Sequence, residues 1–191
     1  MGLFDRIFGG GGGSDEPETP LERLQQAQRD LEQAIENICE KQITINQIID
    51  SKLDQAGSIN DFRDLLNTYE EEITGEIEQE LRVIEEKREE IDKAVGEVAH
   101  ENSRESAKKR AEDREEKIDA LVDDIEEEHS EMKARLDDLE SKIEKQSAGG
   151  HFSKLRDRFR VKLNEDSEAL GEIVDAAERL EGVDPNKVGP A

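Results

Sequence analysis

The sequence predicts an all-α protein built from elongated antiparallel coiled-coil hairpins that are joined by a long charged helix. Charged residues make up 41% of the 191-residue chain and aromatic residues only 3%, a composition typical of long helices and not of a thick globular core. Large apolar residues recur at seven-residue spacing over several stretches. Glycine-containing breaks at residues 56–58 and 147–150 divide these stretches into lengths that can pair as hairpins.

The first expected helix covers about residues 19–55. Thr19, Pro20 and Glu22 are typical of a helix start, because Thr caps the first turn, Pro suits its first position and Glu completes a capping box. Its apolar seam consists of Leu24, Leu31, Ile38 and Ile45, with Leu21, Ile35 and Ile49 in companion positions and Gln28 and Gln42 interrupting them. The two glutamines weaken this seam, and they either fix its register or partner or are merely tolerated.

A second helix is expected from Ser58, directly after the break at Gly57. Its seam consists of Phe62, Tyr69, Ile77, Ile84, Ile91 and Val98, with Leu66, Ile73, Leu81 and Val95 between them. The short connection predicts that this helix runs back along the first one. Residues 19–99 would then form the first hairpin.

The apolar pattern stops at the end of that seam. Residues 100–117 hold only Ala107 and Ala111 among charged and polar residues, without proline or glycine. This predicts a solvated, charged helical connector. Asn102 or Ser103 can instead cap a new helix, and the chain would then fold back.

A second hairpin is expected over residues 118–181. Apolar spacing resumes at Ile118, continues to Ile143, and returns after the glycines from Phe152 to Leu180. The two stretches have similar lengths, which favours antiparallel pairing. Residues 182–191 are expected to be a flexible tail.

The composition narrows the range of functions. With 51 acidic and 27 basic residues the formal charge is −24, which repels nucleic-acid phosphate, so we expect no nucleic-acid partner. Such acidity suits a salt-rich cytoplasm, because charge screening falls to about 3 Å at 1 M salt, although glutamate-rich coiled coils are acidic in any source. The single cysteine, Cys39, excludes an intrachain disulfide, and no apolar run of about 18 residues occurs. We expect a cytoplasmic protein.

Residues 1–8 form the most apolar segment of the chain and are followed by a flexible glycine and acidic linker at residues 9–18. If the segment is helical, one side of about 140° carries its large apolar side chains. These are Leu3, Phe4, Ile7 and Phe8. The segment is interpreted as an anchor that inserts into a membrane or a partner; the other interpretations are an unstructured start or a plug on the protein's own surface.

One stretch concentrates basic residues in alternation with apolar ones. The basic residues are Lys154, Arg156, Arg158, Arg160 and Lys162. On a helix they flank an apolar face, a pattern typical of helices that bind a membrane surface or a partner. Internal ion pairs with the preceding helix explain the same residues, and would place Lys154 near Glu144, Arg158 near Glu140 and Arg160 near Asp138.

Little else in the sequence indicates chemistry. Glu97 and Glu126 each precede a histidine by three residues, at His100 and His129, the spacing with which di-iron four-helix bundles bind metal. In so glutamate-rich a chain this spacing arises easily by chance, and no apolar four-helix core is expected around these histidines. No nucleophile with its base, phosphate loop or zinc cluster is found. We therefore predict no metal, no cofactor and no enzymatic activity.

The opening Met-Gly-Leu-Phe-Asp-Arg-Ile-Phe, the glycines after it and the helical hairpin that starts at Thr19-Pro20-Leu21-Glu22 resemble the ESCRT-III family. The related phage-shock-protein A family likewise starts with an amphipathic helix before a coiled-coil hairpin. The resemblance implies a peripheral membrane remodeller that forms homo-oligomers or polymers, with hairpins side by side. The acidic second helix departs from the basic hairpin of eukaryotic ESCRT-III. The competing hypothesis is a soluble structural or adaptor rod of a cytoskeletal, motility or viral scaffold kind, whose N-terminus binds a protein partner.

Overall fold

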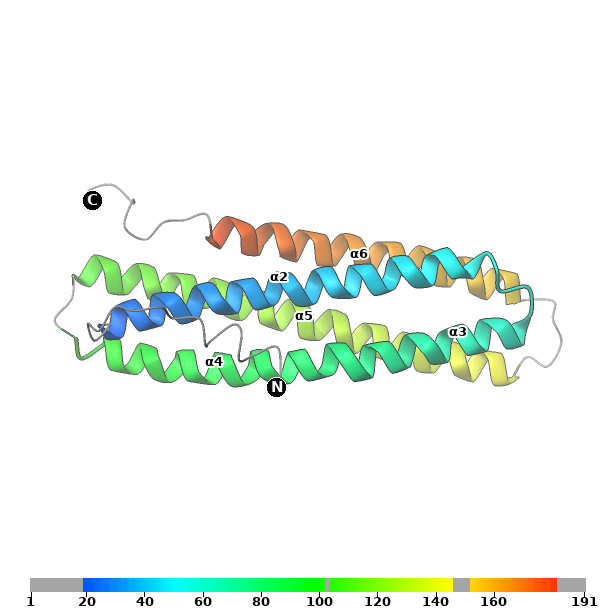
Figure 1. The fold of residues 1–191 in the computed structure, drawn as a ribbon, viewed down its shortest axis with the longest axis horizontal. Coiled ribbons are helices and arrows are strands. Elements are labelled where there is room, and N and C mark those ends of the chain that lie inside the picture. Colours follow the sequence, from blue (N-terminus) through cyan, green and yellow to red (C-terminus); the bar gives the residue numbers. More distant parts are fainter. Residues whose placement is uncertain (1–18, 102–103, 146–151, 182–191) are drawn as a thin grey trace, which may run out of the picture.

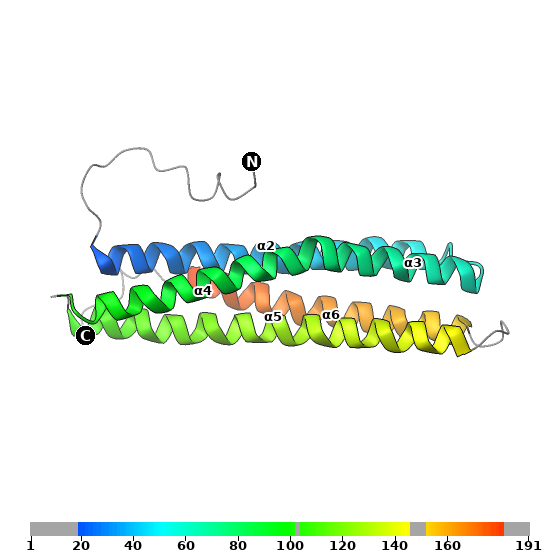
Figure 2. The same ribbon diagram turned by 90° about the horizontal axis from the view of Figure 1, so that it is seen from below.

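The computed structural model describes residues 19–101, 104–145 and 152–181, and every regular element in these ranges is helical. Four antiparallel rods form an elongated bundle (Figure 1). The rods are α2 (Pro20–Leu53), a second rod of α3 (Ile59–Glu72), η1 (Ile73–Ile77) and α4 (Glu78–Val98), then α5 (Glu105–Lys145) and α6 (Phe152–Glu181). Seen from below, α2 and α3 with the start of α4 form one layer, α5 with α6 forms the other, and α4 slopes from the first layer toward α5 (Figure 2). The predicted all-α fold is confirmed.

Both helix starts of the first layer follow the local sequence signals. At α2 the Thr19 hydroxyl accepts from the backbone N–H of Glu22, and the Glu22 carboxylate accepts from the backbone N–H of Thr19, each at 3.2 Å. At α3 the Ser58 hydroxyl accepts from the backbone N–H of Asp61 at 3.1 Å. These bonds satisfy donors that a helix start otherwise leaves unpaired.

The second rod contains one π-helical turn, η1, which explains an irregularity of the apolar seam. The seam is spaced by seven residues except between Tyr69 and Ile77, where the spacing is eight. A π turn accommodates one additional residue, and η1 lies within this interval. Both Tyr69 and Ile77 are consequently buried on the same side of the rod. Gly75, at the centre of η1, is a poor α-helix former and tolerates the altered turn.

The prediction of a solvated, charged helical connector over residues 100–117 is wrong. Helix α4 ends at Val98, the backbone turns at Ala99 to Glu101, and α5 starts at Glu105 and runs back through the bundle for 41 residues. The fold-back alternative is therefore the one observed, whereas Asn102 and Ser103 lie outside the described residues. The Glu101 carboxylate also accepts from the backbone N–H of Leu21 at 3.0 Å, which links this turn to the start of α2.

Polar and small residues attach the first part of α5, which is why its apolar pattern is so weak. Ala111 is buried, and its carbonyl accepts from the Gln28 Nε2 at 2.8 Å. Arg114 is also buried and donates to both carboxylate oxygens of Glu32, each at 2.6 Å. This segment is therefore not a separate solvated rod. A buried arginine and a buried glutamate replace an apolar contact.

The predicted seam residues are buried within one core that all four rods share. They are Leu24, Leu31, Ile38, Ile45, Phe62, Tyr69, Ile84 and Ile91, each at most 8% exposed. The same core includes residues from α5 and α6. These side chains are thus packed inside a single chain. The two predicted hairpins pack on each other as layers instead of following one another along a rod.

A polar layer crosses the middle of this core. The Tyr69 hydroxyl donates to Asn46 Oδ1 at 2.6 Å, and Gln42 Nε2 donates to the same oxygen at 2.8 Å. The Asn46 side-chain amide in turn donates to the hydroxyl of Ser167 on α6 at 3.2 Å. Gln42 therefore belongs to a network that links three rods, and such a network favours one register over its alternatives.

Candidate functional site

The predicted insertion residues Leu3, Phe4, Ile7 and Phe8 lie outside the described residues, as do the linker 9–18 and the tail 182–191. The described surface that bears on function is therefore that of the bundle. Two features of it stand out by their charge. One is the basic stretch of α6, and the other is a line of carboxylates between the second rod and α5.

The basic stretch lies on α6 with its apolar face inside the bundle. Leu155, Phe159 and Leu163 are buried, and the Phe159 ring lies 5.8 Å from the Tyr69 ring and 6.0 Å from the Phe62 ring, between centroids. This face is consequently filled by the chain itself, so it does not meet a membrane in this structure.

The ion pairs of the basic stretch differ from those predicted. Arg160 contacts α2, where it donates to Asp50 at 3.0 Å and Asp54 at 2.6 Å, and not Asp138 on α5. The prediction failed because α6 packs against α2 as well as α5, and the hairpin argument considered only α5. Lys162 pairs with Glu165 on its own helix at 2.9 Å.

The remaining basic residues of the stretch make few contacts. Arg156 lies over the Phe152 ring, 5.4 Å from its centroid, and 3.7 Å from Asp157. Lys154 and Arg158 are exposed, and neither has an ion pair or hydrogen bond within the described residues. The predicted neighbours Glu144 and Glu140 do not pair with them. Two cations of this strongly acidic protein are thus left for external contacts.

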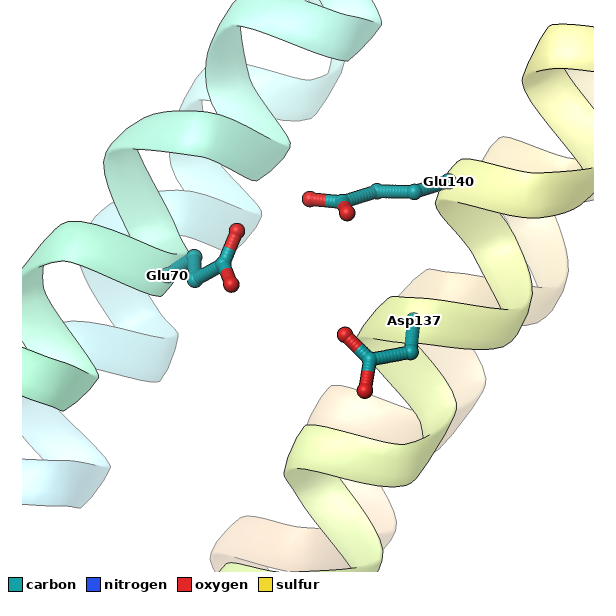
Figure 3. A group of neighbouring side chains, drawn as sticks. All are labelled: Glu70, Asp137 and Glu140. Carbon is teal, nitrogen blue, oxygen red and sulfur yellow. The ribbon is translucent and has the colours of Figure 1, made fainter.

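Carboxylates meet across the interface between the second rod and α5, which we call the acidic seam. It contains three pairs: Glu70 with Glu140, Glu85 with Glu126, and Asp92 with Glu115. Figure 3 shows Glu70 extending from α3 toward Glu140 and Asp137 on α5. Two like charges this close repel each other, so one group of each pair keeps its proton to higher pH.

The pKa shifts follow this geometry. Burial, followed by a hydrogen bond with Asp92, raises the pKa of Glu115 to about 8. The hydrogen bond with Glu85, followed by burial, raises the pKa of Glu126 to about 7. Burial and the hydrogen bond with Glu70 also raise the pKa of Glu140. The acidic seam therefore binds protons at pH values where exposed carboxyl groups are ionised.

Cations interrupt the acidic seam at two places. Arg88 donates to Asp119 at 3.0 Å and to Asp123 at 2.9 Å. Lys133 donates to Glu78 at 2.6 Å, and this bond holds the pKa of Glu78 below its usual range. These contacts attach α5 to α4 between the repelling pairs.

His129 lies at the same interface, and the expectation that no four-helix core surrounds it is wrong. It is 8% exposed, and a four-helix core does surround it. Its Nε2 lies 3.3 Å from Glu78 Oε1. Burial lowers the pKa of His129, and the hydrogen bond with Glu78 opposes that effect. Glu126, three residues before it, contacts Glu85 instead, so this Glu-x-x-His spacing does not gather two ligands.

Two carboxylate triads occur in the acidic seam among the described residues. Glu70, Asp137 and Glu140 form one, and Asp92, Glu115 and Asp119 form the other, with one oxygen of each residue within 4.8 Å of the others. Oxygen-only sets of this kind suit hard cations such as Ca²⁺ or Mg²⁺. In the second triad Arg88 already supplies a positive charge to Asp119.

Sequence reasoning missed the acidic seam, although a signal for it exists. Glu85 and Asp92 are seven residues apart on α4, as are Asp119 and Glu126 on α5, with Glu140 fourteen further on. A seven-residue repeat of carboxylates flanking an apolar seam predicts that they face a neighbouring helix.

These features identify the protein's structural class as an antiparallel four-helix bundle with charged contacts between its helices. Comparison with protein-family models, curated proteins and solved structures found no match. Among the helices that the structure describes, none is both long and apolar enough to cross a membrane.

Proposed function

We propose that the protein is a non-enzymatic, self-associating helical scaffold that attaches to a membrane surface through Leu3, Phe4, Ile7 and Phe8. The observation that carries the proposal is a contrast within the chain. The first eight residues hold four large apolar side chains, whereas residues 19–181, where described, bury their large apolar residues in their own core. Only Ile48 and Val161 remain exposed among large apolar side chains there.

The free energies of burying and of ordering the N-terminal segment favour membrane attachment by several copies together. Full burial of four large apolar side chains contributes about 6–12 kcal/mol. Ordering eight residues costs about 1–2 kcal/mol each, so one segment alone binds weakly. Copies held in one assembly insert their segments almost intramolecularly, which raises the overall affinity by about 10²–10⁴. Self-association and membrane attachment therefore support each other.

The acidic surface favours membrane attachment by apolar insertion over attachment by attraction between charges. A formal charge of −24 repels anionic lipid at long range. Binding that depends on apolar insertion strengthens when salt screens this repulsion, whereas binding through basic residues weakens. The same charge opposes a nucleic-acid partner.

Co-sedimentation with liposomes tests this proposal, at about 0.1 M and 1 M salt, which span weak and strong screening. The full chain is compared with a chain lacking residues 1–13 and with the variant Phe4→Asp/Phe8→Asp. We expect the full chain to sediment with lipid, more of it at 1 M salt, and the truncated chain and Phe4→Asp/Phe8→Asp to remain in solution. The variant Ile48→Asp serves as the matched control, because Ile48 is an exposed apolar residue of the bundle, and it should sediment like the full chain.

Equal sedimentation of all four proteins would contradict insertion by the N-terminal segment. If no protein sediments with lipid at either salt concentration, membrane insertion is also contradicted. That result would favour the soluble structural or adaptor protein. The N-terminal peptide would then serve as bait for a protein partner.

A further inference from the structure

One face of α6 carries opposite charges on its two halves. Between Lys154 and Ala176, at about 100° per residue, eight residues fall on a single side of the helix, and Arg179 and Leu180 continue that side beyond them. The eight are Lys154, Arg158, Val161, Lys162, Glu165, Ala169, Glu172 and Ala176, and we call them the α6 outer face. Its first half is basic, and acidic or small residues make up the second half.

The basic half has charge and apolar surface available for contacts. Lys154 and Arg158 are exposed without an ion pair in the described chain. Between them and Glu165 lies Val161, whose 54% exposure is the largest among the exposed large apolar residues of the described part. Val161 and the two unpaired cations are therefore accessible to a partner.

The acidic half borders a groove of about 250 Å³ between α5 and α6. Asp124, Glu127 and Glu128 line it from α5, and Glu172 lines it from α6. Its apolar lining comes from Leu121, Ala169, Ile173 and Ala176. Small side chains at positions 169 and 176 leave the groove open to an inserted side chain.

Only part of the acidity of this groove is compensated within the chain, through the charge of Arg135 near Glu128. Oε2 of Glu128 is buried and lacks a hydrogen-bond partner. Burial, and then the neighbouring Asp166, raises the pKa of Glu128. No ion pair of Asp124, Glu127 or Glu172 occurs among the described residues. A cation delivered to the groove would therefore be stabilised.

We infer that the α6 outer face is a self-complementary dimer interface, on which a second copy of this chain lies antiparallel. A two-fold axis near Glu165 places Arg158 of each copy against Glu172 of the other, and Val161 against Ala169 at the edge of the groove. Each favourable contact then occurs twice, as in any isologous interface. The inference rests on the self-association part of the proposed function and gives it a surface.

The overall negative charge does not exclude this arrangement. Two chains of charge −24 repel each other at long range, but at physiological salt charges separated by more than about 8 Å are largely screened. The interaction between the basic half of one copy and the acidic half of the other acts at shorter distances, where screening is weaker. There Arg158 meets Glu172, and each Glu165, which lies near the axis, is paired with Lys162 of its own helix. A parallel pairing in register would place Arg158 against Arg158 and Glu172 against Glu172.

A charge exchange tests the interface, with the dissociation constant of the full chain measured by sedimentation velocity at about 0.15 M salt. Arg158→Glu and Glu172→Arg should each weaken the dimer by about tenfold or more, because the two-fold axis makes one substitution alter two contacts. The double variant Arg158→Glu/Glu172→Arg restores opposite charges and should return the constant to within about threefold of the parent.

The control variant is Arg63→Glu on α3. Arg63 is exposed and has no ion pair within the described residues, and this substitution changes the net charge as Arg158→Glu does, so it should leave the dimer intact. A monomeric parent, an equal loss with Arg63→Glu, or a double variant as weak as the singles would overturn the inference. Circular dichroism verifies that each variant folds.

The chain lacking residues 1–13 separates this inference from the proposed membrane attachment. It should dimerise like the full chain in the absence of lipid, because the α6 outer face is retained. A dimer that fails to bind liposomes would contradict only the membrane attachment. A monomer that binds liposomes through residues 1–8 would contradict only the interface.

Discussion

Arg114 on α5 and Glu32 on α2 form a buried ion pair, in which the Nε and Nη2 of the arginine each donate to one carboxylate oxygen at 2.6 Å. Arg114 is 9% exposed and Glu32 fully buried. The pair attaches the start of α5 to α2, eighty-two residues away in sequence. It explains how a segment with few apolar residues packs into the bundle.

Loss of one member of this pair should destabilise the bundle strongly. Arg114→Met removes this cation from the buried Glu32 carboxylate, and we expect the free energy of unfolding to fall by about 3–5 kcal/mol. The double variant Glu32→Leu/Arg114→Met removes both charges and should be more stable than Arg114→Met alone. Urea denaturation followed by circular dichroism measures both. A double variant less stable than the single one would contradict this account.

The Glu85–Glu126 pair should make stability depend on pH. The pKa of Glu126 is raised to about 7 in the folded protein, against about 4.5 when unfolded. Between these values the folded state binds more protons, so the free energy of unfolding falls as the pH rises from about 4.5 through 7. Arg88 lowers and Asp123 raises the pKa of Glu126 by smaller amounts.

Glu126→Gln should therefore stabilise the protein at pH 8 by about 0.5–1 kcal/mol, the scale of partly exposed charge pairs, and leave it nearly unchanged at pH 4.5. Thermal unfolding at the two pH values measures the difference. Glu89→Gln, at an exposed position of α4, is the control and should have little effect at either pH. Equal stabilisation at both values would show that no proton is retained by the pair.

The π turn predicts which single-residue deletion the second rod tolerates. Deletion of Gly75 changes the Tyr69 to Ile77 spacing from eight to seven, which a continuous α-helix accommodates. We expect its melting temperature to lie within about 5 °C of the parent, equivalent to about 1–2 kcal/mol. Deletion of Glu86, in a regular part of α4, rotates Ile91 and Val98 out of the core and should cost several times more. Similar melting temperatures for both deletions would argue against the π turn.

Cys39 reports on opening of the bundle. It is fully buried, and burial, with a smaller effect of Glu40, raises the pKa of its thiol to about 12. A thiol reagent attacks the thiolate, so we expect at least about a hundredfold slower labelling at pH 8 than in urea. Arg114→Met should speed labelling, because it weakens the contact of α2 with α5. Rapid labelling of the folded parent would contradict a closed core around Cys39.

Much of the fold is encoded in local sequence. The caps at Thr19 and Ser58, the break at Gly57 and the seven-residue apolar repeat predicted the helices of the first layer and the side that each one buries. These signals are local, because capping bonds span three residues and helix faces follow from the helical period. Even the π turn is visible as the single eight-residue step between Tyr69 and Ile77.

Only the tertiary structure decided how the rods are joined. The fold-back after Val98 depends on contacts such as Arg114 with Glu32 and Gln28 with Ala111, which join residues about eighty positions apart through polar groups. The spacing of apolar residues does not reveal such contacts, because they stabilise the fold only when both polar partners are buried together. The acidic seam and the Arg160 pairing with α2 depend on the same long-range placement, as does the α6 outer face. The sequence by itself determined the helices and their buried faces, and the packing of the two layers determined which charges meet.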